Sequence, residues 1–73
     1  MNGVSRMIHI TLNGQKQTLP ADTTIAQLLQ RQSLEPRGVA VEVNLDIAPR
    51  EQHETWRLAD GDQVEIVTFV GGG

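Results

Sequence analysis

An Asn-Gly dipeptide between two short segments constrains the fold of this chain more strongly than any other feature of its sequence. The segment 7–12 (MIHITL) is apolar at every second position, which is the period of a β-strand with one buried face. Asn13-Gly14 follows directly and favours a type I′ turn, because both central residues of that turn need positive φ. We expect the return strand over residues 15–19, ending at Pro20, which has no N–H to donate. The chain is therefore predicted to open with a β-hairpin.

The segment 22–32 (DTTIAQLLQRQ) has the pattern of a short amphipathic helix. Its large apolar residues lie at positions i, i+3 and i+4 counted from Ile25, so they share one face. Asp22 or Thr23 is expected to cap the first free N–H groups of this helix. The helix must end before Pro36, since the residue preceding a proline favours extended conformations. A helix this short depends on packing its apolar face against a sheet.

The remainder of the chain alternates short strands with turns. Three valines recur at every second position in the segment 39–43, which predicts a strand with one buried face. In order, the expected elements are a strand at 39–43, a turn at 44–46, a short edge segment from Ile47 limited by Pro49, a helical turn and bend within 50–57, a turn at 59–62 and a strand at 63–70.

This order of elements predicts an α+β fold of the β-grasp (ubiquitin-like) type. A hairpin, one crossover helix and further strands give a mixed four- to five-stranded sheet with one helix packed on one face. In this arrangement the last strand lies in the centre of the sheet, beside the first. We expect a loose N-terminal extension at residues 1–6, one β-grasp domain at 7–70 and a flexible C-terminal glycine tail at 71–73.

The composition excludes several classes of function. The 73 residues include no cysteine, which rules out disulfides, thiolate catalysis and thiolate zinc sites. His9 and His53 are the only histidines and lack paired carboxylates at metal-site spacing, and no serine has a neighbouring base. The net charge of −3 disfavours binding to nucleic acid, which requires cations to neutralise phosphates. We expect no metal, no bound cofactor, no nucleic-acid partner and no active site of an enzyme.

The hydropathy of the chain predicts a cytoplasmic protein that does not interact with membranes. No apolar run approaches the roughly 20 residues that a membrane-spanning helix needs. The first residues also lack the apolar core of a signal peptide.

The last strand contains the candidate binding surface. If Val64 and Ile66 face the helix, then Val67 and Phe69 are exposed on the other face of the sheet. Exposed apolar residues at this spacing suggest a docking patch. The alternatives are scattered surface hydrophobic residues and partial cover by the N-terminal extension.

The charge around the last strand is entirely acidic. Residues 58–73 contain Asp60, Asp62 and Glu65 but no Lys or Arg. An acidic surface of this kind is steered toward a basic surface on a partner protein. The alternative is a solvated acidic face that only improves solubility.

Three glycines, Gly71, Gly72 and Gly73, end the sequence. Glycine is costly to order, so this tail is expected to stay mobile until a partner holds it. Fully extended, it reaches about 10 Å beyond the strand, far enough to carry a carboxylate into a narrow active site. Taken alone, the glycines leave two interpretations open, a frayed end and a functional arm.

Several segments resemble the thiamine sulfur carrier family (ThiS). The similar segments are 7–14 (MIHITLNG), 24–30 (TIAQLLQ), Asn44 with 48–50 (APR), and 60–73 (DGDQVEIVTFVGGG). The resemblance covers about residues 7–73. The chain departs from the family at Ala48, where valine is usual, and the aromatic residue frequent near His53 is replaced by Trp56 a few positions later. Both departures concern a peripheral segment.

The resemblance implies that the chain is a protein cosubstrate and not an enzyme. A ubiquitin-activating-like adenylyltransferase (ThiF type) would use ATP to adenylate the carboxylate of Gly73. Sulfur from a cysteine desulfurase or a similar donor would then form a thiocarboxylate, whose sulfur passes to thiazole synthase (ThiG type). The expected site residues are Gly73 as the reactive group, Gly71 and Gly72 as the arm, and Glu65, Val67, Phe69, Asp60 and Asp62 as partner-binding residues.

Three other functions are compatible with parts of this pattern. A carrier for molybdopterin synthesis shares the fold and the glycine tail. A ubiquitin-like tag would use the same tail to form isopeptide bonds with lysines. A regulatory or RNA-contacting β-grasp module would not need the terminal glycines, and the acidic charge of this chain disfavours it.

Overall fold

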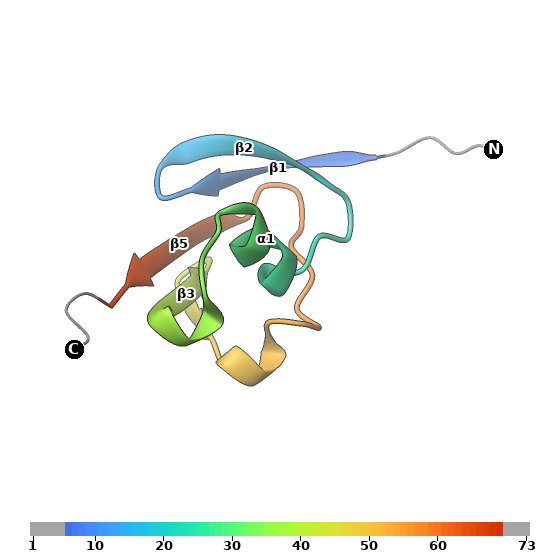
Figure 1. Cartoon of the computed structure of the whole chain (residues 1–73). Coiled ribbons are helices and arrows are strands. Elements are labelled where there is room, and N and C mark those ends of the chain that lie inside the picture. The colour runs from blue at the N-terminus through green and yellow to red at the C-terminus, as the bar shows by residue number, and fades with distance from the viewer. Residues whose placement is uncertain (1–5, 70–73) are drawn as a thin grey trace.

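Residues 6–69 form one mixed five-stranded sheet and one α-helix in the computed structural model, which describes this range of the chain (Figure 1). The elements are β1 (Met7–Leu12), β2 (Gln15–Pro20), α1 (Ile25–Arg31), the 3₁₀-helix η1 (Pro36–Gly38), β3 (Val39–Val43), β4 (Asp46–Ala48), the 3₁₀-helix η2 (Arg50–Gln52) and β5 (Gln63–Thr68). The strand order across the sheet is β2-β1-β5-β3-β4. The predicted α+β fold of the β-grasp type is confirmed.

The β1–β2 hairpin closes at the predicted Asn-Gly turn. Leu12 pairs with Gln15, and the two residues between them have positive φ, 49° at Asn13 and 85° at Gly14. Positive φ at both positions is the signature of a type I′ turn, whose twist matches that of the flanking strands.

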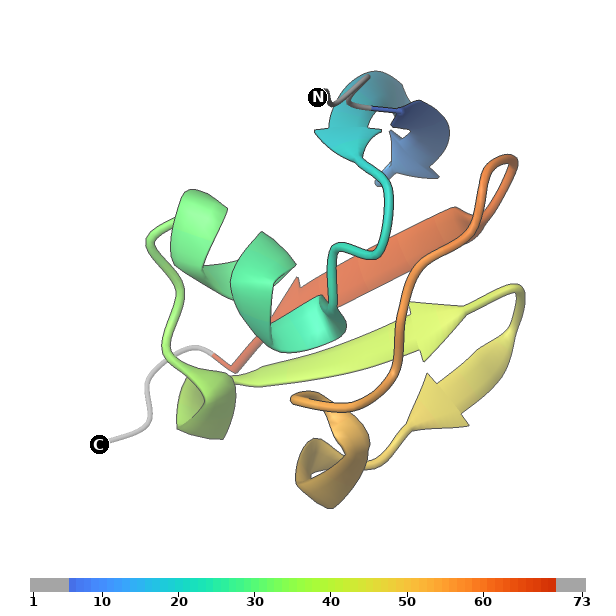
Figure 2. The same cartoon turned by 90° about the vertical axis from the view of Figure 1, so that its right-hand side faces the viewer.

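The last strand occupies the centre of the sheet, as expected. β5 runs parallel to β1, with Thr11 opposite Gln63, and antiparallel to β3, with Val41 opposite Ile66. Strands from the beginning and the middle of the chain therefore flank β5, and β2 and β4 form the two edges of the sheet; Figure 2 shows β4 on the outer side of β3.

Helix α1 begins one or two residues later than the sequence pattern predicted, since the expected N-cap was Asp22 or Thr23. Its N-cap is Thr24, whose Oγ1 accepts a hydrogen bond from the N–H of Gln27 (3.2 Å), while Oε1 of Gln27 accepts from the N–H of Thr24 (2.9 Å). This reciprocal capping box satisfies two free donors. The expected caps are used elsewhere: Asp22 lies in a turn with φ of 70°, and the buried Thr23 donates its hydroxyl to the carbonyl of Pro20.

A local hydrogen-bond pattern ends α1 before Pro36 is reached. Ser33 takes a left-handed conformation with φ of 59°. Its N–H bonds to the carbonyl of Gln30 (3.0 Å), and the N–H of Leu34 bonds to the carbonyl of Leu29 (2.9 Å). This pair of bonds defines a Schellman motif, a common helix stop in which glycine usually occupies the left-handed position.

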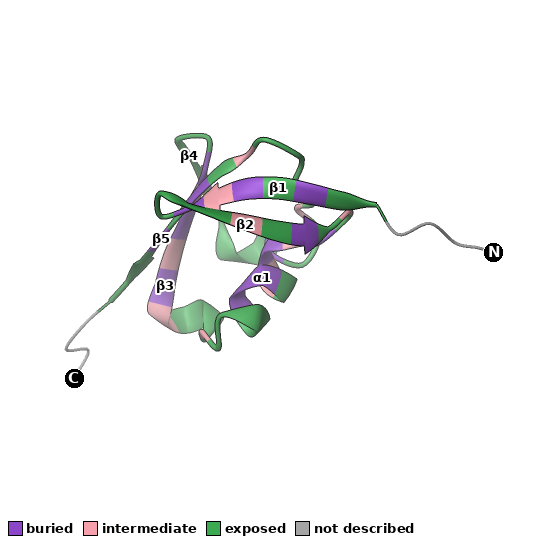
Figure 3. Cartoon of the chain, turned by 90° about the horizontal axis from the view of Figure 1, so that it is seen from above, coloured by how far each residue is buried: buried purple, intermediate pink, exposed green. Residues whose placement is uncertain are grey.

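The core lies between α1 and one face of the sheet. In Figures 1 and 2 the sheet wraps around one side of α1, and Figure 3 shows buried and exposed residues alternating along β1. The buried apolar residues are Ile8, Ile10, Leu12, Leu19, Ile25, Leu28, Leu29, Val39, Val41, Val43, Ala48, Leu58, Val64 and Ile66. We call the sheet face toward α1 the inner face and the opposite one the outer face.

At the N-terminal side, the described fold includes Arg6, which was expected to belong to the loose extension. The carbonyl of Arg6 accepts a hydrogen bond from the N–H of Ala21 (2.8 Å), so Arg6 is joined to the hairpin. The rest of the expected extension, residues 1–5, lies outside the described residues, as do Val70 and the glycine tail 71–73.

Strand β5 is shorter than the expected 63–70. It ends at Thr68, which is exposed instead of continuing the buried row of Val64 and Ile66. β5 ends where its partner β3 begins, because Thr68 is opposite Val39. On its other side, β1 ends earlier, with Leu12 opposite Val64. Beyond Ile66, β5 therefore has a neighbouring strand only on the β3 side.

Candidate functional site

The alternation of side chains along β5 places the two predicted docking residues on the outer face. Val64 and Ile66 are buried, at 1% and 9% exposure, whereas Val67 is 58% exposed and Phe69 is 62% exposed. The prediction of which residues face the helix is thus confirmed. Figure 3 shows the same change, with β5 becoming exposed toward its C-terminal end.

Phe69 is held in line with the sheet although it follows β5. Its N–H donates a hydrogen bond to the carbonyl of Gly38 (2.9 Å), which continues the pairing between β5 and the start of β3. The backbone is therefore positioned as far as the last described residue. A large aromatic side chain that stays exposed at such a position is available for contact with another molecule.

Strand register extends this surface across β3, where Ala40 and Glu42 are half-buried, to β4. Val67 is opposite Ala40, Glu65 is opposite Glu42, and Glu42 in turn is opposite Ile47 on the edge strand. Directly paired residues point to the same face of a sheet. Ile47 is 71% exposed. We define the docking face as the outer-face residues Ala40, Glu42, Ile47, Glu65, Val67 and Phe69.

Asp62 forms hydrogen bonds that hold its turn together. Its Oδ2 accepts from the N–H of Ala59 (2.8 Å), and its Oδ1 accepts from Nδ2 of Asn44 (2.9 Å). The Oδ1 of Asn44 also accepts from the N–H of Gln63 (2.9 Å), so Asn44 ties the β3–β4 turn to the start of β5. Both carboxylate oxygens of Asp62 therefore have partners within the chain.

Asp60 joins the same turn to β1. Its Oδ1 accepts a hydrogen bond from the N–H of His9 (2.7 Å), and Nδ1 of the His9 ring lies 3.6 Å from the same oxygen. The two side chains are 70% and 71% exposed. An ion pair in this setting contributes little to stability, so the backbone hydrogen bond is the more important contact.

The structure separates Asp60 and Asp62 from Val67 and Phe69. The two aspartates precede β5 and the two apolar residues lie at its other end, and a six-residue strand is about 20 Å long. Glu65 is exposed between them and belongs to the docking face. The partner-binding role of the two aspartates stays a prediction, while their bonds give them a role in the fold.

Sequence reasoning missed the contribution of Asn13. Beyond its turn conformation, its Oδ1 accepts from the N–H of Ile66 (2.8 Å) and its Nδ2 donates to the carbonyl of Ile66 (3.3 Å). The side chain thus replaces the backbone of a neighbouring strand where β1 has ended. Ala40, Glu42 and Ile47 were also missed as outer-face residues. The alternation of the valines in 39–43 with Ala40 and Glu42 did indicate that these two face outward.

His53 is buried, at 3% exposure, and contributes to the fold. Its Nε2 lies 3.0 Å from the carbonyl oxygen of Ala48, in hydrogen-bond contact, whereas its Nδ1 has no partner among the described residues. Across residues 6–69 no group of three or more His, Cys, Asp or Glu could hold a metal ion. Within the same range, no helix is long and apolar enough to cross a membrane.

A sheet with one covering helix and an exposed apolar end on its central strand defines a β-grasp protein of the ubiquitin-like class. The chain belongs to the ThiS family, whose model matches residues 9–73. It is 43% identical over 65 residues to the sulfur carrier protein ThiS of Bacillus subtilis, covering 88% of this chain and 98% of that protein. This membership agrees with the expectation that the chain is a carrier and not an enzyme.

Two further similarities concern a solved structure and a larger protein. The crystal structure of the thiamine biosynthesis protein ThiS from Geobacter metallireducens matches with a TM-score of 0.75 and 32% identity, covering 90% of this chain and 100% of that one. A thiazole synthase of Paramagnetospirillum magneticum is 39% identical over 64 residues. That match covers 88% of this chain, which spans only 20% of the length of the synthase.

Proposed function

We propose that the chain is a sulfur carrier protein for thiazole formation in thiamine biosynthesis, acting as a cosubstrate of partner enzymes. The observation that carries this proposal is the match of the ThiS family to residues 9–73, which include both the docking face and the terminal glycines. The exposed end of β5 supports it, because a carrier must bind each partner through a surface that its own fold leaves free.

The proposed chemistry takes place at the carboxylate of Gly73. A carboxylate oxygen attacks the α-phosphorus of ATP in an adenylyltransferase of the ThiF type, and pyrophosphate leaves. The outer sulfur of a persulfide formed by a cysteine desulfurase or a similar donor then attacks the acyl carbon and displaces AMP. A thiol reductant cleaves the S–S bond of the resulting acyl disulfide and ends in a disulfide with the sulfur of the donor. The product is a thiocarboxylate on Gly73. ATP and the sulfur donor are substrates of the partner enzymes, and these reactions are assigned to the cytoplasm.

The chain's own residues bind the partner enzyme and carry the reacting carboxylate of Gly73 into its active site. Val67 and Phe69 give an apolar contact beside the end of β5. Gly71 and Gly72 have no Cβ, so they fit a narrow channel and do not block the approach of a nucleophile to Gly73.

The thiazole synthase relative supports the thiazole pathway over molybdopterin synthesis. In that relative, a segment similar to this chain belongs to the same polypeptide as the rest of the synthase. Residues joined in one chain meet at a high effective concentration, which suits a carrier that delivers its sulfur to the synthase.

Intact-protein mass spectrometry tests the proposed chemistry. The chain is incubated with ATP, the adenylyltransferase and a sulfur donor, and we expect a mass gain equal to the replacement of one oxygen by one sulfur. A variant lacking Gly72 and Gly73 is the control and should stay unmodified. If the complete chain forms neither an AMP adduct nor the sulfur-containing product, the proposal is wrong.

A deletion strain distinguishes the pathways. A strain that lacks the gene should grow only when thiazole is added. Complementation of molybdenum-cofactor synthesis should not restore its growth. Conjugates of high molecular weight on a blot against the chain would instead support a ubiquitin-like tag.

A further inference from the structure

Two glutamates on the outer face stand directly opposite each other. Glu42 on β3 and Glu65 on β5 are partners in the antiparallel register. Such partners have Cβ atoms about 5 Å apart on one face, and like charges at that position are destabilising. Within residues 6–69 the one contact of 4.0 Å or less between oppositely chargeable side chains joins His9 and Asp60, so no cationic group lies that close to either glutamate. The free chain therefore contains a repulsive pair that its fold does not require.

Apolar side chains surround this pair on the docking face. Ile47 is opposite Glu42 on one side, and Val67 follows two residues after Glu65 on the other. Ala40 lies opposite Val67 and adds a small apolar surface between the strands. The combination of two uncompensated carboxylates with an exposed apolar surround resembles one half of a protein interface, in which apolar contact and charge complementarity act together.

The other half of the outer face is different. On the β1–β2 hairpin, His9 pairs with Thr18 and Thr11 pairs with Lys16. The remaining outer-face pair joins Met7, which is 49% exposed, to Pro20, so the hairpin presents apolar, polar and cationic residues but no carboxylate. The acidic and apolar combination is thus confined to β5, β3 and β4. This combination continues to Phe69, the last residue of the described range.

We propose that the docking face binds the adenylating enzyme through a cationic side chain placed between Glu42 and Glu65, with apolar side chains of the enzyme on Ile47 and Val67. This inference rests on the proposed function, because it takes the enzyme that adenylates Gly73 as the partner. Both substrates of that enzyme, the carboxylate of Gly73 and ATP, are anionic, so we expect it to present a cationic surface to the carrier. The guanidinium of an arginine fits two adjacent carboxylates, because it donates several hydrogen bonds at once.

Opposite effects on stability and binding follow from this arrangement. Replacing one carboxylate by the isosteric carboxamide removes the repulsion in the free chain, and it also removes half of the charge that attracts the enzyme. A residue with only a structural role would not become more stable and bind less tightly through the same change.

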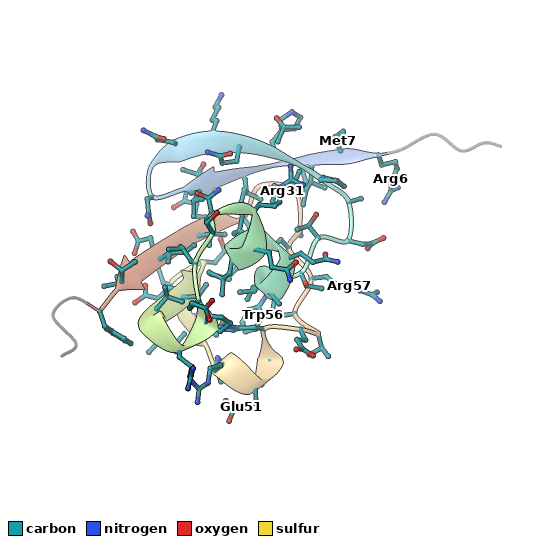
Figure 4. The ribbon with its side chains drawn as sticks, viewed as in Figure 1. Arg6, Met7, Arg31, Glu51, Trp56 and Arg57 are labelled. Atoms are coloured by element: carbon teal, nitrogen blue, oxygen red, sulfur yellow. The ribbon has the colours of Figure 1, made fainter. Side chains whose placement is uncertain are left out.

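The test uses the full chain with Glu42→Gln, Glu65→Gln, both changes together, and Glu51→Gln as the matched control. Glu51 lies on η2, outside the sheet, and its side chain points away from the molecule in Figure 4. We expect each docking-face variant to raise Tm by about 1 to 5 °C. We expect Kd for the adenylating enzyme to rise about 5-fold for each single variant at low salt, and the difference to shrink as ionic strength increases. Glu51→Gln should change neither quantity.

The outcomes separate this inference from the proposed function. If the wild-type chain is adenylated but the docking-face variants bind the enzyme as tightly as Glu51→Gln does, the interface is wrong and the carrier function stands. If the enzyme does not adenylate the wild-type chain, the carrier function itself fails. Self-association of the wild-type chain that the double variant abolishes, measured by sedimentation velocity, would assign the face to a second copy and overturn the inference.

Discussion

At the scale of single residues, Leu45 is the side chain least suited to its backbone conformation. It lies with Asn44 in the two-residue turn between β3 and β4, and both have positive φ, 52° at Asn44 and 72° at Leu45. Its side chain is 85% exposed and so gains little from packing. The left-handed region costs an ordinary L-residue about 1–2 kcal/mol, which glycine avoids.

Leu45→Gly should therefore stabilise the chain by up to about 1 kcal/mol, after the larger entropy of glycine in the unfolded state is subtracted. Urea unfolding followed by circular dichroism measures this change. Leu45→Ala removes the apolar side chain but keeps the strained conformation, so its effect should stay within about 0.5 kcal/mol. Equal stabilisation by both variants would show that exposure, and not backbone strain, is the cause.

At the scale of secondary structure elements, side chains complete the strand ends and the helix start where backbone pairing stops. The amide of Asn13 pairs with the backbone of Ile66 beyond the end of β1. The capping box of Thr24 and Gln27 does the same for the first turn of α1. A seven-residue helix and a six-residue strand depend on such contacts, because short elements have few internal hydrogen bonds.

Asn13→Gly keeps a residue that tolerates positive φ but removes both bonds to Ile66. We expect a loss of about 1 kcal/mol in the free energy of unfolding. Native-state hydrogen exchange should show the N–H of Ile66 exchanging about 5-fold faster, since it loses its acceptor. Asn13→Asp keeps that acceptor and is the matched control. If Ile66 exchanges equally fast in both variants, the side-chain bond does not protect it.

At the scale of the whole molecule, the sheet has one face that builds the core and one face that is free for contact. The same strand, β5, supplies Val64 and Ile66 to the core and Glu65 and Val67 to the docking face. Stability and binding therefore depend on alternate residues of one segment. This separation allows the two properties to be changed independently.

Phe69→Ala should leave the free energy of unfolding within about 0.5 kcal/mol of the wild-type value, because the side chain is 62% exposed. Its Kd for the adenylating enzyme should rise about 10-fold, as expected for an aromatic contact residue. Ile66→Ala, the buried counterpart on the same strand, should cost about 2–4 kcal/mol of stability. Thermal unfolding and calorimetric titration measure both effects. A large stability loss for Phe69→Ala would place that side chain in the core.

Local patterns in the chain were sufficient to predict the hairpin, the helix and the side of β5 that is buried. Asn13-Gly14 specifies its turn through backbone sterics, and the alternation of Val64 and Ile66 with Val67 is a direct consequence of the strand period. These predictions concern neighbours within a few residues, where the geometry of the backbone leaves little choice.

Contacts between distant segments could not be predicted in this way. Nothing local shows that Glu42 pairs with Glu65, that Asn13 bonds to Ile66, or that the carboxylate of Asp62 is occupied by Asn44. Each of these contacts depends on the strand register. The register is set by the packing of all the apolar residues against α1. Periodicity in the sequence identifies which residues can share a face, but only the tertiary structure decides which of them are neighbours, because that choice is made by the packing of the whole core.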